Sequence, residues 1–442
     1  MQNPATTKER LPPSPPLTTS EPSSDVGGPY ARYVLGVLFV VYIFNFIDRQ
    51  ILAILLQPIK EDLKISDTAL GFLTGFAFAV FYTFAGLPLA RIADRWVRRS
   101  LIAISLATWS FWTAASGLAR GFADLAIARI FVGIGEAGAT PPAHSLLSDY
   151  FPPEKRATAF AIYASGIYVG VGIGFFVGGW INDHYGWRTA FYVLGLPGIL
   201  MALVVRFTVR EPRRGMSEHQ PVSTRQHTMR EVWRFFAALP AGRSISLAGG
   251  FHAFVGYGLG AWLPAFFVRV HHMTPGALGR WLSWITAIGG LVGAFAGGWI
   301  ADRWVKRNPR ARALVGLTGA ILAIPFIAAS VLLADYRSAL LCYLPATVFS
   351  TLWLGPAVAI VQDLVPPSMR AMASAVFLFI VTIIGLGAGP QTIGIMNDWI
   401  GTPDAVRYSL LYVSVGMNLI SAWFFWLTAK TLVQDLEAKK KL

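Results

Sequence analysis

Long apolar segments separated by short polar ones run along nearly the whole chain. A helix needs about 20 apolar residues to cross a bilayer, because its backbone polar groups must be paired within the segment. Twelve such segments occur, so the pattern predicts an all-α membrane protein. The predicted transmembrane helices lie at residues 31–57, 67–92, 100–119, 122–147, 157–181, 189–209, 244–268, 278–301, 312–333, 338–362, 370–395 and 407–430.

Four pairs of short strings recur at separations of 208 to 215 residues and predict two similar halves. They are ADRWVRR at 93–99 with ADRWVKR at 301–307, SDYFPP at 148–153 with QDLVPP at 362–367, KRA at 155–157 with MRA at 369–371, and ND at 182–183 with ND at 397–398. Six crossings return the chain to its first side, so both copies run through the membrane in the same direction. A parallel repeat of this kind places a substrate path between two six-helix halves.

The segments outside the helices complete the predicted organisation. The first 29 residues hold seven prolines and no apolar run, so they cannot bury enough surface to fold. We therefore predict a disordered cytoplasmic tail at 1–29, an N-terminal six-helix half at 30–209, a cytoplasmic linker at 210–243, a C-terminal six-helix half at 244–430 and a cytoplasmic tail at 431–442.

The chain carries a formal net charge of +14, and the placement of this charge predicts the topology. Of the 37 Lys and Arg residues, 27 fall in the tails and loops on one side of the predicted membrane. Basic loops remain in the cytoplasm, so both termini are expected there, and the charge requires no nucleic-acid partner. The basic linker at 210–243 can also contact the headgroups of anionic membrane lipids.

Few residues have the type or spacing of a catalytic or metal site. The single cysteine, Cys342, excludes an internal disulfide and a cysteine metal cluster. His144 and Asp149 match a short acyltransferase-like pattern, but a match of this length is weak evidence for catalysis. We therefore expect no cofactor, no metal ion and no enzymatic activity.

Several motifs together resemble the major facilitator superfamily of membrane transporters. They are DRWVRR at 94–99 with its copy at Asp302, Arg129 followed by Gly133 and Gly135, the helix with Gly166, Gly170, Gly172 and Gly174, and GWR at 186–188. Within the superfamily, NFIDR at 45–49 and GIGEA at 133–137 resemble the Spinster-like branch. The branch implies lysolipids or sphingolipids, including sphingosine-1-phosphate, as substrates.

Charged residues inside two predicted helices indicate a proton pathway. An ionisable residue at bilayer depth costs at least about 2.5 to 3.5 kcal/mol, so it usually faces a partner or a wet cavity. Asn45, Asp48 and Arg49 share one helical face, and Arg129 and Glu136 share another because they are two turns apart. We expect Asp48 and Glu136 to bind protons, with the two arginines as their partners. The alternative is a pair of structural ion pairs that only hold the helices together.

The C-terminal half lacks such charges well inside its helices, so its wall of the path should be apolar. A cavity that is charged on one wall and apolar on the other suits a substrate with a polar head and an apolar tail. The residues that we expect to bind this substrate are Arg49 and Asn45 in the N-terminal half and Phe251, His252, Tyr257 and Trp353 in the C-terminal half.

Acids and bases at matching positions of the two repeated loops indicate a conformational latch. A charge cluster that forms in one state and breaks in the other is what rigid-body switching requires. The expected gating residues are Asp94, Arg95, Arg98 and Asp149 in the first half and Asp302, Arg303, Lys306 and Asp363 in the second. The alternative is that these basic loops only orient the chain in the membrane.

Together these features predict a proton-coupled secondary transporter that moves an amphipathic lipid by alternating access. The first alternative keeps the fold and takes a small organic anion as the substrate. The second is a membrane receptor or scaffold that does not transport. We expect a monomer in a bacterial cytoplasmic membrane, with protons, the substrate and membrane lipids as its partners.

Overall fold

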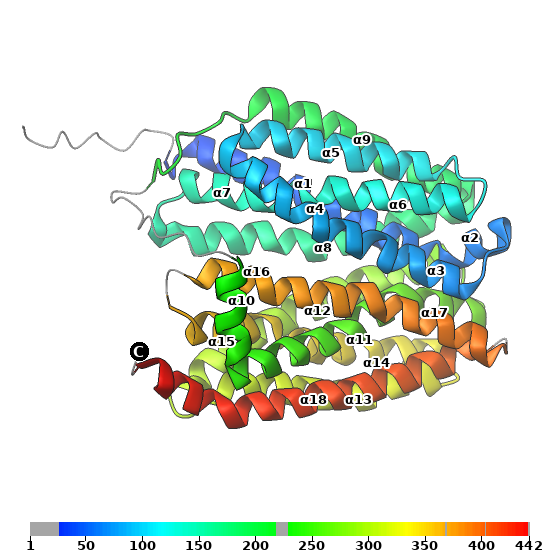
Figure 1. The fold of residues 1–442 in the computed structure, drawn as a ribbon. Coiled ribbons are helices and arrows are strands. Elements are labelled where there is room, and N and C mark those ends of the chain that lie inside the picture. Colours follow the sequence, from blue (N-terminus) through cyan, green and yellow to red (C-terminus); the bar gives the residue numbers. More distant parts are fainter. Residues whose placement is uncertain (1–25, 218–228, 367–368, 403, 441–442) are drawn as a thin grey trace, which may run out of the picture.

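A computed structural model describes residues 26–217, 229–366, 369–402 and 404–440. Every regular element in these ranges is a helix, and the helices form two stacked layers that correspond to the two halves of the chain (Figure 1). Most of the tail predicted at 1–29, part of the linker predicted at 210–243 and the last two residues of the chain lie outside the described residues.

The N-terminal half contains α1 to α9. Their bounds are α1 Pro29–Ile54, α2 Leu56–Leu63, α3 Asp67–Thr74, α4 Phe76–Arg95, α5 Arg98–Ser116, α6 Phe122–Ala137, α7 Thr140–Tyr150, α8 Pro153–Tyr185 and α9 Trp187–Thr208. In the linker, α10 covers Met229–Ala238 and leads into the C-terminal half. That half comprises α11 Pro240–Val270, α12 Pro275–Val305, α13 Ala311–Leu332, α14 Tyr336–Thr351, α15 Leu354–Leu364, α16 Arg370–Val381, the π-helical segment η2 Thr382–Ala388, α17 Gly389–Ile400 and α18 Ala405–Lys440.

The all-α membrane fold predicted from the sequence is confirmed. Among the described residues, ten helical segments are long and apolar enough to cross a membrane. The remaining two predicted spans, at 100–119 and 122–147, correspond to α5 and to α6 with α7. α5 is less apolar because it is rich in Ser, Thr and Trp, while α6 is a separate helix of 16 residues that carries Asp124, Arg129 and Glu136.

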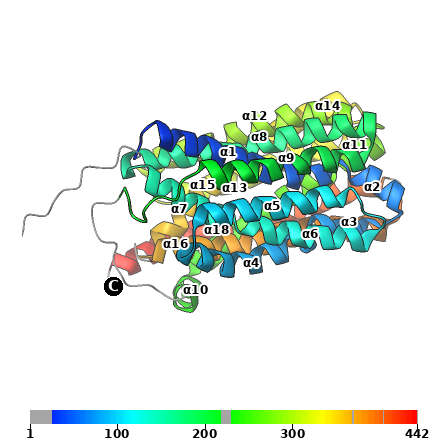
Figure 2. The ribbon, with the colours of Figure 1, turned by 90° about the horizontal axis from the view of Figure 1, so that it is seen from above.

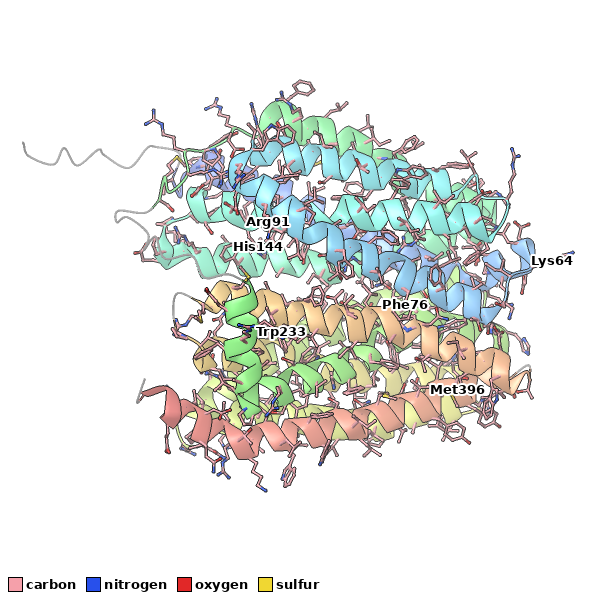
Figure 3. The ribbon with its side chains drawn as sticks, viewed as in Figure 1. Lys64, Phe76, Arg91, His144, Trp233 and Met396 are labelled. Atoms are coloured by element: carbon pink, nitrogen blue, oxygen red, sulfur yellow. The ribbon has the colours of Figure 1, made fainter. Side chains whose placement is uncertain are left out.

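Several predicted spans are interrupted helices, and glycine and proline explain two of the breaks. A Cβ atom at Gly75, between α3 and α4, would lie 2.6 Å from the carbonyl oxygen of Gly387 in η2, so only glycine permits this approach. Gly138 ends α6, and Pro141 and Pro142 stand in the first turn of α7, where their missing N–H groups cost no hydrogen bond. Figure 3 shows Phe76 at the crossing of α4 and η2.

α1 begins and α18 ends at the same end of the bundle, which we call the termini side; the opposite end is the far side (Figure 2). α18 continues through residue 440, so the described part of the tail predicted at 431–442 is helical. The carboxylate of Asp435 accepts a hydrogen bond from the backbone N–H of Ala241 at 2.7 Å and attaches this extension to the start of α11.

The two halves pack most closely through α8 against α12 and through α3 and α4 against η2 and α17. A Cβ atom at Gly179 would lie 2.3 Å from the carbonyl oxygen of Pro275, and one at Gly279 would lie 2.2 Å from that of Phe175. Small residues therefore bring the helix backbones together, as is common where lipid supplies no hydrophobic driving force.

Candidate functional site

A buried acid–base cluster joins α1 to α6 inside the N-terminal half. Arg49 Nε donates a hydrogen bond of 2.8 Å to Oε2 of Glu136, and the Glu136 side chain is fully buried. Asp48 and Arg129 are 1% and 3% exposed. The structure thus brings together the four charged residues that the sequence predicted as proton-coupling residues.

The second acid and base of this cluster do not form a direct side-chain pair. Nη1 of Arg129 lies 3.4 Å from the backbone carbonyl oxygen of Asp48, which accepts its hydrogen bond. Oδ1 of Asp48 has no hydrogen-bond partner among the described residues, although the Thr113 hydroxyl is nearby. The amide of Asn45 lies beside Glu136, also without a complete hydrogen bond. The cluster therefore contains one carboxylate bound to an arginine and one that is not.

Aromatic rings surround the two guanidinium groups. The guanidinium carbon of Arg49 lies 5.1 Å from the ring centre of Phe46, 4.8 Å from that of Phe78 and 5.0 Å from that of Tyr82. Arg129 lies 5.2 Å from the Phe78 ring. Cation–π contacts of this kind are strongest where water is excluded. The sequence interpretation missed Phe78 and Tyr82, although their spacing of four on α4 marks a shared helical face.

Tyr257 is the predicted substrate residue of the C-terminal half that faces this cluster. Its side chain stands on α11, is 37% exposed, and lies close enough to Arg49 for the two groups to interact electrostatically. Tyr257 and Arg49 belong to different halves, and their helices α11 and α1 pack against each other.

The other predicted substrate residues of the C-terminal half lie within that half. Phe251 stacks on Phe424 of α18, with ring centres 5.8 Å apart and an interplanar angle of 9°. Nε2 of the buried His252 lies 3.0 Å from the carbonyl oxygen of Ser350, and its ring centre is 5.5 Å from that of Trp353. The structure does not bring these three predicted residues into contact with Arg49.

At the termini side, two of the gating residues of the first copy, Arg98 and Asp149, are bonded to each other within the N-terminal half. Arg98 is 1% exposed and donates to Asp149 at 2.6 Å, to Ser145 at 2.7 Å and to Glu211 at 2.7 Å. Asp94 and Arg95 are exposed and take part in none of the ion pairs found among the described residues. Sequence reasoning missed Glu211, which follows α9 in the linker.

The second copy has a different arrangement. Arg312 of α13 pairs with Asp363 and lies 3.8 Å from Asp302. Lys306, the counterpart of Arg98, is exposed, and Arg303 lies over the Trp299 ring at 5.3 Å. Arg312 therefore occupies the place in this copy that Arg98 has in the first. The sequence repeat could not show this exchange, because Arg312 lies outside the repeated string.

At the far side, one acid of the N-terminal half binds residues of both halves. The guanidinium of Arg269 donates to Asp67 at 2.5 and 2.9 Å, and Nδ2 of Asn397 donates to it at 3.0 Å. Nζ of Lys60 lies 2.5 Å from the same carboxylate. A pocket of about 540 Å³ is lined by these residues and by Asp398. The sequence interpretation included none of them among its site residues.

The repeated Asn-Asp pair provides two matching contacts across the halves at the far side. Asp398 of α17 accepts hydrogen bonds from the backbone N–H groups of Asp67 and Thr68 at 3.1 and 2.7 Å. Asp183 of α8 accepts one from the N–H of Gly276 at 3.0 Å. Each carboxylate thus caps the N-terminus of a helix in the opposite half, where the helix dipole favours an anion. The hydrogen bonds found between the halves among the described residues all lie at this end.

A buried charge cluster beside the contact between two similar helical halves, sealed across those halves at one end, is typical of a membrane transporter. The chain belongs to the Major Facilitator Superfamily, whose family model matches residues 38–390. It is accordingly a membrane transporter with Spinster-like homologues, and it is not an enzyme.

Three relatives and one solved structure define the similarity. An MFS-type efflux pump of Mycolicibacterium smegmatis is 31% identical over 423 residues, which cover 93% of this chain and 96% of the relative. Protein spinster homolog 1 of Homo sapiens is 30% identical over 393 residues, which cover 83% of this chain and 72% of the relative. A Bacillus subtilis protein named as a probable galactarate/D-glucarate transporter is 25% identical over 443 residues, which cover 92% of this chain and 94% of the relative. The solved structure is that of a bacterial homologue of the human lysosomal transporter Spinster, inward-facing and unoccupied, with a TM-score of 0.84, 32% identity, and coverage of 92% of this chain and 98% of that chain.

Proposed function

We propose that this transporter couples the movement of protons to the movement of an amphipathic lipid, by alternating access. The observation that carries the proposal is the buried cluster of α1 and α6, in which Glu136 is bound to Arg49 while Asp48 keeps a carboxylate oxygen without a partner. Two acids in one low-dielectric site with unequal partners can take up a proton at one while the other remains ionised.

Protonation of this cluster changes the forces between the two halves. A proton on Glu136 removes the negative charge that holds Arg49, and Arg49 is the group that faces Tyr257 of the other half. A guanidinium released from its carboxylate can bind an anionic substrate headgroup through its fork of donors. Proton uptake and substrate binding are thereby linked through one side chain.

Alternating access requires that the seal at the far side opens when the termini side closes. The described state has its bonds between halves at the far side, through Asp67, Asp183 and Asp398. We assign the termini side to the cytoplasm, because most of the Lys and Arg residues outside the predicted helices belong to it. The described state is then inward-facing, like the Spinster homologue with a TM-score of 0.84. The proposed location is a bacterial cytoplasmic membrane.

A lipid substrate is supported by the contrast between the two walls of the path and by the resemblance to the Spinster-like branch, which implies lysolipids or sphingolipids as substrates. The charged wall belongs to α1 and α6, and the opposing helices of the C-terminal half contribute mainly aromatic and aliphatic side chains. The alternative substrate, a small organic anion, is supported by the relative named as a galactarate/D-glucarate transporter. Arg49 suits the polar group of either substrate.

Flux measurements in proteoliposomes test the proposal. An inward proton gradient should drive movement of a labelled lysolipid, and collapse of the gradient by an ionophore should abolish that drive. In competition, a lysolipid should be more effective than a short carboxylate of equal charge, because each buried methylene contributes about 0.8 kcal/mol. Equal competition would support the small-anion alternative, and absence of flux for both would support a receptor or scaffold.

A further inference from the structure

The second copy of the repeated loop has basic side chains on the surface where the first copy has a buried one in ion pairs. In the first copy, Arg98 is held by Glu211, which follows the last helix of its half. In the second, Asp363 pairs with Arg312, and Lys306 stays exposed. Lys306 takes part in none of the ion pairs found among the described residues.

Among the described residues, no acid at the end of α18 is found in an ion pair with the loop after α12, as Glu211 is with Arg98 in the first copy. α18 continues as a helix through residue 440. Its buried acid, Asp435, is already bonded to the N–H of Ala241 at the start of α11. Within the described part of the chain, the basic end of α12 therefore keeps an unbalanced positive charge.

Lys306 and two neighbouring arginines, Arg303 and Arg307, line a groove at the end of α12. Its volume is about 600 Å³. The residues that line it are Trp299, Ile300, Arg303, Trp304, Lys306 and Arg307. The side chains of Trp299 and Trp304 are 64% and 39% exposed. Indole rings and basic side chains placed together at the end of a membrane helix are typical of the headgroup level of a bilayer.

An exposed apolar stripe on α12 leads directly into this groove. Ile288, Val292, Phe295 and Trp299 are four, three and four residues apart, so they lie on one face of the helix. Their exposed fractions are 50%, 50%, 67% and 64%. Gly298 adds open space beside the stripe, since a Cβ atom there would meet no other atom within 4 Å. The stripe is long enough to follow several carbons of an acyl chain.

We propose that this groove binds the headgroup of an anionic phospholipid, whose acyl chain lies along the stripe. The phosphate would supply the negative charge that Glu211 supplies in the first copy, and Arg303 and Arg307 offer the planar donor geometry that suits it. Anionic lipids gather in the leaflet that faces basic loops, so this ligand is available at the termini side. The apolar stripe distinguishes a lipid from free phosphate.

Lipid titration of the purified full-length protein, followed by native mass spectrometry, tests the site. The parent protein should retain phosphatidylglycerol in preference to phosphatidylcholine. The variant Arg303→Gln/Lys306→Gln/Arg307→Gln should bind phosphatidylglycerol roughly a hundredfold more weakly, because each basic residue near a membrane contributes about 1 kcal/mol. Arg303→Lys/Arg307→Lys, which keeps the charge and loses the planar donors, should fall between the two.

A matched variant controls for net charge. Arg32→Gln/Arg91→Gln/Arg213→Gln removes three exposed cations from the N-terminal half and the linker, and it should retain phosphatidylglycerol like the parent. Equal loss in both triple variants would show general attraction to a basic surface and overturn the proposal.

A second arm separates a lipid from free phosphate. Inorganic phosphate in excess should leave phosphatidylglycerol bound, whereas Phe295→Ser, in the middle of the stripe, should weaken its binding several-fold. Displacement by inorganic phosphate, or full retention in Phe295→Ser, would overturn the assignment of a lipid to this groove.

Discussion

At the far side Asp67 of one half binds Arg269 of the other, whereas at the termini side Arg98 binds Asp149 of its own half and Glu211 of the linker that follows it. Both ends bury a carboxylate against a guanidinium. Only the far-side bond must break when the halves rock apart at that end. A bond within one half moves as part of a rigid body, so its contribution changes little between the two states.

This difference separates residues that select the conformation from residues that build each half. Asp67, Asp183 and Asp398 contribute mainly to the state that is sealed at the far side. The Arg49–Glu136 pair lies within the N-terminal half, but its guanidinium also faces Tyr257 across the halves. A change of charge in the central cluster can therefore shift the equilibrium between the two conformational states.

The largest effect on this comparison should follow from Asp67→Asn. The substitution leaves Arg269 and Lys60 without the carboxylate that they share, in a site where Asp67 is 2% exposed. Loss of one partner of a buried pair costs about 3 to 5 kcal/mol, so the far-side-sealed population should fall by roughly a hundredfold or more. Distances between spin labels on the far-side ends of the two halves would measure the shift.

Asp62→Asn is the matched control for that prediction. Asp62 also pairs with an arginine on the far side, Arg188, but both residues are exposed and belong to one half. Exposed pairs contribute about 0 to 1 kcal/mol, and this pair does not cross the halves. A distance distribution that changes as much in Asp62→Asn as in Asp67→Asn would contradict the proposed seal.

The next largest effect should follow from removal of the titrating groups in the central cluster. Asp48→Asn and Glu136→Gln keep the size of each side chain and remove its exchangeable charge. Proton-driven flux should fall by about tenfold or more, which corresponds to about 1.4 kcal/mol, and the dependence of the label distances on pH should flatten. Flux and distance measurements across a pH series provide both results.

Asp124→Asn is the control for the central cluster, because Asp124 is exposed and bonded to the nearby N–H of Arg120. Its flux and pH response should equal those of the parent. Should both amide variants of the cluster also retain the parent's flux and pH response, the four charges form only a structural network.

A smaller effect is expected for the helix caps formed by the repeated Asn-Asp pair. Loss of a cap costs about 1 kcal/mol, so Asp183→Ala or Asp398→Ala should reduce the far-side-sealed population about fivefold. Asp335→Ala offers a close comparison, since Asp335 caps α14 through the N–H of Ser338 within one half at 2.9 Å. It should lower thermal stability slightly and leave the label distances unchanged. The reverse ranking of these variants would refute the assignment.

The sequence predicted the parts of this molecule that depend on one helix at a time. Apolar length identified the membrane fold, and charges inside apolar segments identified Asp48, Arg49, Arg129 and Glu136, which the structure brings together. Contacts between helices could not be predicted in the same way. Hydropathy shows that a segment is buried, but it does not show which other helices the segment contacts.

The far-side seal illustrates this limit. Asp67 and Arg269 belong to different halves, and neither carries a repeated string that would mark the pair. The Asn-Asp repeat did carry a signal, but only the structure shows that Asp183 and Asp398 reach helix ends of the opposite half. In the same way, the loop motif does not show that Asp363 pairs with Arg312 rather than with Lys306, because this choice depends on the packing of the helices.

The smallest effect is expected at the termini side, for the two matching acids of the repeated loops, Asp149 and Asp363. Asp149→Asn removes a charge that Arg98 shares with Glu211 and that the N–H of Gly215 also approaches at 2.9 Å. Because these partners belong to one half and its linker, we expect a population shift of only about twofold to threefold. If the loop contributes to closure at the termini side, the shift should be toward the far-side-sealed state. Asp363→Asn removes the matching charge of the second half and should act in the same direction. Label distances on the termini side, measured for both variants, test this expectation, and unchanged distributions in both would exclude a latch at these acids and leave them a structural role within each half.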